Sequence, residues 1–302
     1  MGENLKSINF FLKANNSNLN HKVSRDNLID LLSFQNIENH ENNQILIANN
    51  KIKDLDFDFD NDKKINTENI KKIYNQSIDI IDLSLRDVDF NFNQIFRRGK
   101  INLNCERHLK IFNNFKIISE FCFNCYKVLI EPSNVVDLIK LHIFFDNLNL
   151  ENNNVRKCMI EYRKNVNGTY KGLIYCRSLK EAKDITEDIS LRLKTIINEN
   201  INIKIKHGCT DYYNTFPKYK NLDSDTMTYD KKWKNIENTF DQQNPSLKNS
   251  LKDRSTIKGN CLKDILTIRN WLYFSKLKGD NSYQMITENI YPSKYIENLV
   301  NN

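Results

Sequence analysis

Cysteines with spacings suited to metal binding are the most informative residues of this chain. Cys122 and Cys125 form a Cys-x-x-Cys pair, and Cys176 and Cys209 follow farther along the sequence. Two thiolates in a short knuckle can face one centre, which is how zinc and iron–sulfur sites are held. The alternative chemistry is a dithiol redox centre, in which Cys122 attacks and Cys125 resolves. The sequence therefore predicts a zinc ion or an iron–sulfur cluster bound by these four cysteines.

Several other side chains are alternative ligands for the same site. Cys105 and His108 lie upstream with a Cys-x-x-His spacing, so they could complete a local zinc site with the Cys-x-x-Cys pair. His207 comes two residues before Cys209 and could replace its thiolate, and Cys158 is a further candidate. Free cysteine is also among the most buried residue types, so each thiol could instead be a small apolar core group.

The composition indicates a folded protein of the cytoplasm. The 302 residues are 39% hydrophobic and 11% aromatic, which is enough to build one large or two ordinary domains. The first 20 residues lack the apolar core of a secretory leader, and no window approaches 18 uncharged apolar residues. We therefore expect no membrane association. In the cytoplasm the seven cysteines should be reduced or metal-bound.

The positive charge points to a nucleic acid or another polyanion as a partner. The formal net charge is +7 and the isoelectric point is about 8.9. A loop with Tyr212, Tyr213, Lys218 and Lys220 could stack on bases and contact phosphates, or its aromatic side chains could pack on the core. No glycine-rich phosphate loop and no zinc-protease or serine-nucleophile motif occurs in the chain.

Residues 116–210 alternate between strand and helix patterns and form the predicted central domain. In order, the predicted elements are a strand at Tyr126–Glu131, a helix at 133–145, a strand at 156–163, a strand at Tyr170–Cys176, a helix that begins after Ser178, and a strand at 201–206. This βαββαβ order predicts an α+β, ferredoxin-like domain with an antiparallel four-stranded sheet. Both helices should cover one face, because each crossover is right-handed.

The strand order of such a sheet brings the cysteines together. The first strand should lie between the third and fourth strands, antiparallel to both. Its beginning, which follows the Cys-x-x-Cys pair, should then lie beside the strand ends that carry Cys176 and Cys209. Neighbouring strands are about 4.8 Å apart, so the four thiols are expected within ligand distance. The sheet face away from the helices should carry several lysines and is expected to be buried under the terminal segments.

The flanking segments are predicted to be mainly helical. Residues 1–115 form an N-terminal mixed segment, and residues 211–302 form the aromatic loop and a helical segment that packs on the core. The predicted helices lie at 5–13, 25–33, 67–81, 109–115, 231–240 and Leu262–Leu277, and the predicted strands lie at 44–48 and 54–62. The last of these strands is strongly acidic, which is typical of a solvated strand.

Three functions are compatible with these features. The first is a metal-binding α+β protein with its cysteine cluster at one end of the sheet. The second is an RNA-binding or RNA-modifying factor that uses the basic surface. The third is an enzyme for a small substrate, with the cysteines lining its pocket. The sequence places no catalytic residue, so enzyme activity is an open alternative.

Overall fold

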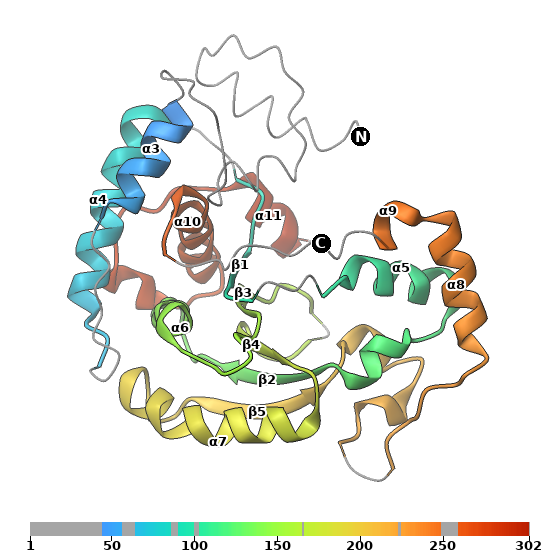
Figure 1. Cartoon of the computed structure of the whole chain (residues 1–302). Coiled ribbons are helices and arrows are strands. Elements are labelled where there is room, and N and C mark those ends of the chain that lie inside the picture. The colour runs from blue at the N-terminus through green and yellow to red at the C-terminus, as the bar shows by residue number, and fades with distance from the viewer. Residues whose placement is uncertain are drawn as a thin grey trace.

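A five-stranded antiparallel sheet with helices around it organises this mixed α+β protein (Figure 1). The structure is a computed structural model that describes residues 44–55, 64–85, 90–99, 103–164, 166–222, 225–248 and 259–301. The helices predicted at 5–13 and 25–33, and most of the acidic strand predicted at 54–62, lie outside these residues.

The strand order in the sheet is β1-β3-β4-β2-β5, and every neighbouring pair is antiparallel. The strands are β1 (Gln94–Arg97), β2 (Tyr126–Glu131), β3 (Arg156–Ile160), β4 (Tyr170–Cys176) and β5 (Asn202–His207). The four predicted strands are present, although β3 ends three residues early. The prediction of four strands was nevertheless incomplete, because β1 pairs with β3 and extends the sheet by one strand.

Two helices cover one face of the sheet. Helix α6 (Val135–Asn147) packs on β3 and β4, and α7 (Leu179–Ile196) packs mainly on β2 and β5. The Asn134 side chain caps α6 by accepting the Asp137 N–H at 2.9 Å, so the helix begins after Asn134 rather than after Ser133. Ser178 caps α7 as predicted, accepting the Glu181 N–H at 3.1 Å.

Helix α6 is buried on nearly all sides because a second layer of helices covers it. This layer contains α3 (Gln44–Lys53), α4 (Thr67–Leu85), α10 (Leu262–Leu277), the short helix η4 (Asn281–Met285) and α11 (Lys294–Asn301). Helix α10 contacts α3, α4, α6 and α11 (Figure 1). The strand predicted at 44–48 was wrong. Ala48 and Ile52 are both fully buried and lie four residues apart, which is helical spacing.

The remaining helices gather at one end of the sheet. Helix α5 (Cys105–Phe115) contacts α8 (Trp233–Gln243) and α9 (Pro245–Lys248), and Figure 1 shows these three together, apart from α10. The α5–α8 contact contains buried ion pairs, because Arg107 binds Asp241 at 2.6 Å and Glu237 at 3.1 Å. Three short helices complete this end: η1 (Glu120–Asn124), η2 (Thr210–Tyr212) and η3 (Pro217–Lys220).

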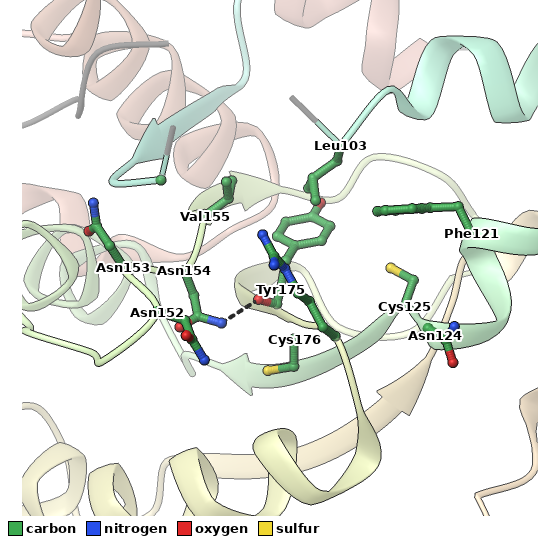
Figure 2. A pocket seen from close by; sticks show the side chains of 12 residues that line it. Leu103, Phe121, Asn124, Cys125, Asn152, Asn153, Asn154, Val155, Tyr175 and Cys176 are labelled. Atoms are coloured by element: carbon green, nitrogen blue, oxygen red, sulfur yellow. Dashed lines mark hydrogen bonds between the residues drawn. The ribbon is translucent and has the colours of Figure 1, made fainter. Parts of the chain in front are cut away.

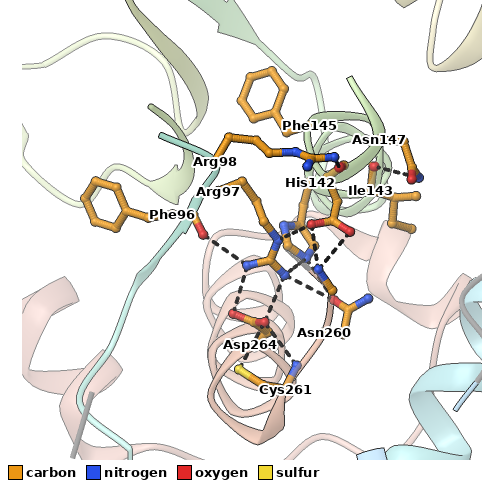
Figure 3. A network of polar contacts seen from close by, with 12 residues as sticks. Phe96, Arg97, Arg98, His142, Ile143, Phe145, Asn147, Asn260, Cys261 and Asp264 are labelled. Carbon is orange, nitrogen blue, oxygen red and sulfur yellow. Dashed lines mark hydrogen bonds and ion pairs between the residues drawn. The ribbon is translucent and has the colours of Figure 1, made fainter. Parts of the chain in front are cut away.

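A buried arginine joins β1 to the helical layer (Figure 3). The Arg97 side chain is almost fully buried and forms ion pairs of 2.8 Å with both Asp146 of α6 and Asp264 of α10. Its guanidinium also contacts His142 at 3.2 Å and Asn260 at 3.4 Å. Burial alone would lower the pKa of Arg97, but the two carboxylates raise it above its usual value. This network fixes the short strand β1 at the edge of the sheet.

Candidate functional site at the cysteine end of the sheet

The predicted meeting of three strand ends is confirmed. Tyr126 at the beginning of β2 pairs with Cys176 at the end of β4 and with His207 at the end of β5. The Gly208 N–H donates to the Cys125 carbonyl at 2.7 Å, which continues this pairing beyond the strands. The ends of the strands therefore bring the Cys-x-x-Cys pair, Cys176 and the segment with Cys209 to one edge.

A buried lysine lies among three of the thiols at this edge. Lys127 is 5% exposed, and its ammonium donates to the Gly208 carbonyl at 2.9 Å and to Cys209 Sγ at 3.3 Å. Burial works to lower the pKa of Lys127, but the neighbouring Cys209 and Cys125, together with Cys105, hold it well above its usual value. Lys127, Cys105, Cys125 and Cys209 are called the lysine–thiol cluster below.

The other cysteines of interest lie in different surroundings. Cys158 and Cys176 are buried in the core between the sheet and its helices, and burial raises the pKa of Cys176 to about 12. Side chains alternate along a strand, so Cys125 and Tyr126 point to opposite faces of the sheet. Cys176 pairs directly with Tyr126 and shares its face, so Cys176 and Cys125 point to opposite faces. Cys122 packs in a separate apolar cluster, where its sulfur lies 3.5 Å from the Tyr212 hydroxyl.

Neither of the two candidate histidines lies in a group that could hold a metal. Both ring nitrogens of His207 contact backbone carbonyls, Nδ1 that of Tyr219 at 2.6 Å and Nε2 that of Phe123 at 3.0 Å. His108 stacks on Phe121, and burial followed by the Arg107 charge lowers its pKa to about 4. In the ranges that the structure describes, no group of three or more His, Cys, Asp or Glu side chains is arranged to hold a metal ion.

The aromatic loop packs on the core. Tyr212 is fully buried, and the buried Tyr219 donates its hydroxyl hydrogen to the Cys122 carbonyl at 2.6 Å. Tyr213 donates to the His207 carbonyl at 2.5 Å, and Lys218 pairs with Asp225 at 3.0 Å. Lys220 is exposed. The structure therefore agrees with the alternative in which these aromatic side chains are core groups rather than a base-stacking surface.

A pocket of about 340 Å³ opens beside the lysine–thiol cluster (Figure 2). Its apolar wall consists of Leu103, Phe121, Val155 and Tyr175, and its other lining residues are Gly99, Asn124, Cys125, Asn152, Asn153, Asn154, Cys176 and Arg177. This size and this mixture of apolar wall and few polar groups are typical of small-ligand sites. The pocket could not be predicted from the sequence, since the Asn152–Asn154 run resembles the many other asparagines of the chain.

Two polar residues of this pocket differ in what they offer a ligand. Asn154 is 7% exposed, and its amide nitrogen donates to the Tyr175 carbonyl and to Glu181 Oε1, both at 2.8 Å. Its amide oxygen has no hydrogen-bond partner within the described part of the chain, but it is buried and out of reach of a ligand in the pocket. The exposed Arg177 side chain forms no ion pair with any described residue. A ligand with a negative group could pair with Arg177.

Comparison of the chain with family models, curated proteins and solved structures finds no match. Among the described residues, no helix is both long and apolar enough to cross a membrane. The pocket and the charged groups around it are therefore the structural features that indicate a function.

Proposed function

We propose that the protein binds a small anionic ligand with an aromatic or other apolar body in the pocket at the cysteine end of the sheet. The observation that carries this proposal is a pocket of about 340 Å³ that combines an apolar wall, which includes the partly exposed Phe121 ring, with the Arg177 cation. Burying the apolar body of a ligand against this wall would contribute about 25 cal/mol for each Å² of apolar surface removed from water.

The other lining residues narrow the chemistry of the ligand. Phe121 is 48% exposed, which leaves much of its ring free to pack against a planar group. Arg177 supplies a cation at the rim, so an anionic substituent on the ligand would form a charge-assisted hydrogen bond there. An aromatic ring that carries a phosphate or a carboxylate satisfies both requirements.

We also propose that the segment from β2 to β5 is a ferredoxin-like unit to which β1 is added beside β3, because its strand order is that of the predicted domain.

The strands beside the pocket support a rigid site. The pocket takes Tyr175 and Cys176 from the end of β4, and Cys125 directly precedes β2. Side chains held by paired strands keep their positions better than side chains on free loops.

A substitution of Arg177 tests the proposal. A panel of nucleoside monophosphates and aromatic amino-carboxylates, with the neutral nucleosides and amides as counterparts, is screened by thermal shift and then by calorimetry. For the compounds that bind, Arg177→Gln should weaken affinity about tenfold, because it removes one charge-assisted hydrogen bond.

The matched control is Lys180→Gln, which removes the same charge close by in α7. Lys180 pairs with Asp184 at 2.7 Å and does not line the pocket. Its substitution should change affinity less than twofold. The proposal fails if no compound binds, or if neutral and anionic compounds bind equally well and Arg177→Gln leaves both affinities unchanged.

Metal binding by the cysteines is the second candidate function. Its support is that the thiols of Cys105, Cys122, Cys125 and Cys209 lie close enough together to affect the pKa of one another. The Lys127 ammonium weakens this candidate, because a buried positive charge among the thiols repels a metal cation. The small-ligand site is therefore the better supported of the two.

Metal analysis of purified protein tests this second candidate. A site that uses the lysine–thiol cluster should give about one zinc or one iron–sulfur cluster per chain, and Cys209→Ser should remove most of it. Cys261→Ser is the control, because Cys261 donates to Asp264 at 3.2 Å in the Arg97 network and serine keeps that hydrogen bond. Metal-free protein, or equal metal content in both variants, would rule out a site at this cluster.

A further inference from the structure

A second pocket lies where α6 begins, at the opposite end of β2 from the cysteines. Strand β2 ends at Glu131 and α6 starts at Val135, whereas Cys125 precedes β2, so the length of this strand separates the two pockets. The volume of the second pocket, called the α6 pocket below, is about 400 Å³. Six of its lining residues are Lys64, Val136, Asp137, Lys140, Ile197 and Met285.

Lys140 is the more buried of the two cations that line the α6 pocket. The residue is only 7% exposed and belongs to the buried helix α6. Side chains of a helix lean toward its N-terminus, so Lys140 reaches back over Asp137 and Val136, which lie three and four residues earlier and line the same pocket. Its ammonium group remains accessible to solvent, unlike fully buried polar atoms such as the Asn154 amide oxygen. The buried stem therefore holds the ammonium at the pocket wall.

The Lys140 ammonium has no counter-ion in contact with it. Within the described residues, no ion pair of 4.0 Å or less includes Lys140, and its side chain makes no hydrogen bond there. Burial lowers the pKa of Lys140 more than the nearby Asp137 raises it. A largely buried and unpaired ammonium is costly, and a ligand carboxylate that paired with it would reduce that cost.

Asp137 supplies the opposite charge one helical turn before Lys140. Its Oδ2 atom accepts from the Ser133 hydroxyl at 2.8 Å and from the Asn134 and Asn198 amides at 3.1 and 3.0 Å. These three hydrogen bonds fix the carboxylate at the start of α6. The Oδ1 atom has no hydrogen-bond partner within the described part of the chain and remains accessible to solvent. Asp137 therefore has one oxygen that can accept from a ligand.

The charges around the α6 pocket favour a ligand that carries both signs. Lys64 and Lys140 are positive, and Asp137 and Glu199 are negative, so the formal charges of the lining cancel. A simple anion would meet two carboxylates, and a simple cation would meet two ammonium groups. An α-amino acid has a carboxylate and an ammonium on the same carbon atom. It can therefore face Lys140 and Asp137 at the same time.

We propose that the α6 pocket binds a free α-amino acid with an apolar side chain. The carboxylate of the ligand accepts from the Lys140 ammonium, and its ammonium donates to Asp137 Oδ1. Val136, Ile197 and Met285 supply the apolar part of the lining. Met285 is 53% exposed, so its flexible thioether side chain can pack on the ligand. The site is independent of the pocket at the cysteine end, since the two pockets share no lining residue.

Calorimetry and thermal shift with L-leucine, and with two analogues that each lack one charge, test the site. L-Leucinamide lacks the carboxylate and N-acetyl-L-leucine lacks the ammonium, so each should bind about tenfold more weakly than L-leucine. Lys140→Met should weaken leucine binding by about tenfold but should not weaken leucinamide binding, because the amide has no carboxylate for Lys140. The control is Lys194→Met, which removes an exposed lysine near the end of α7 that does not line the pocket. It should change leucine affinity less than twofold.

The melting temperature without ligand separates loss of binding from loss of folding. Lys140→Met should melt at or above the wild-type temperature, because methionine keeps the apolar stem and removes an unpaired charge. A much lower melting temperature would overturn the proposal, since Lys140 would then already have a partner. So would absence of leucine binding, an analogue that binds as tightly as leucine, or equal weakening by Lys194→Met and Lys140→Met. If Arg177→Gln abolishes leucine binding while Lys140→Met does not, leucine occupies the pocket at the cysteine end and the α6 pocket is ruled out.

Discussion

Arg97→Met should lower the free energy of unfolding by about 3–5 kcal/mol, because it leaves two buried carboxylates without their cation. Arg97 is 1% exposed, and its guanidinium pairs with Asp146 and Asp264 at 2.8 Å each. Methionine fills a similar volume, so the loss reflects uncompensated charge more than a cavity. Strand β1 should also loosen from the sheet edge, since this network is its main polar link to α6 and α10.

Urea denaturation of the variant and of a control measures this effect. Lys110→Met removes an exposed cation that pairs with Glu106 within α5, and should cost less than about 0.5 kcal/mol. The triple variant Arg97→Met, Asp146→Leu and Asp264→Leu should recover much of the lost stability, because it removes the unpaired charges as well. A cost below about 1 kcal/mol for Arg97→Met, or a triple variant less stable than the single one, would contradict this account.

The central elements could be predicted from the sequence because their signals are local. Alternation of polar and apolar residues marks β5, and the Ser178 cap marks the start of α7 within a few residues of chain. Strand β1 has only four residues, Gln-Ile-Phe-Arg, which is too short for a clear alternation. Its position depends on the pairing with β3 and on the Arg97 network, and both are long-range contacts.

The candidate site was predicted in part. The order of the strands placed the thiols at one edge, and the pairing of Tyr126 with Cys176 and His207 confirms that edge. The order of the strands does not specify on which face of the sheet each thiol lies. Counting alternate residues from Val128, which points to the helices, places Tyr126 on the helix side and Cys125 on the other. Because Cys176 pairs with Tyr126, this alternation places the Cys176 side chain on the face opposite to the lysine–thiol cluster.

Other features of the site could not be read from local patterns. The unpartnered oxygen of Asn154 arises because its amide nitrogen is held by Tyr175 and Glu181, which follow it by 21 and 27 residues. Such contacts depend on side-chain positions and not on residue type.

A second large loss of stability is expected from Gly208→Ala, at the junction between β5 and the aromatic loop. Gly208 has a φ of +51°, and a Cβ there would lie 2.0 Å from the Tyr219 hydroxyl oxygen. That hydroxyl donates to the Cys122 carbonyl at 2.6 Å, and the Tyr219 ring stacks on His207. The variant must therefore displace a fully buried tyrosine and break the link between η3 and η1.

The expected cost of Gly208→Ala is about 3 kcal/mol or more. The left-handed backbone contributes roughly 1–2 kcal/mol and the lost buried hydrogen bond about 1–3 kcal/mol. Gly279→Ala is the matched control, because Gly279 has a φ of +75° but no atom within 4 Å of the added Cβ. It should show only the backbone contribution, so equal losses in the two variants would contradict the predicted clash.

Tyr219→Phe provides a further comparison, since it removes the hydroxyl oxygen but keeps the two ring carbons that the new methyl group would meet at 2.4 and 2.5 Å. Alone it should cost about 0.5–1.5 kcal/mol, because the Cys122 carbonyl loses one donor but still accepts from the Cys125 N–H at 3.1 Å. Combined with Gly208→Ala it should cost less than the sum of the single variants, because both disrupt the same contact. Additive losses would mean that the two residues act independently. The Gly208 carbonyl also accepts from Lys127, so a shifted backbone should disturb the lysine–thiol cluster.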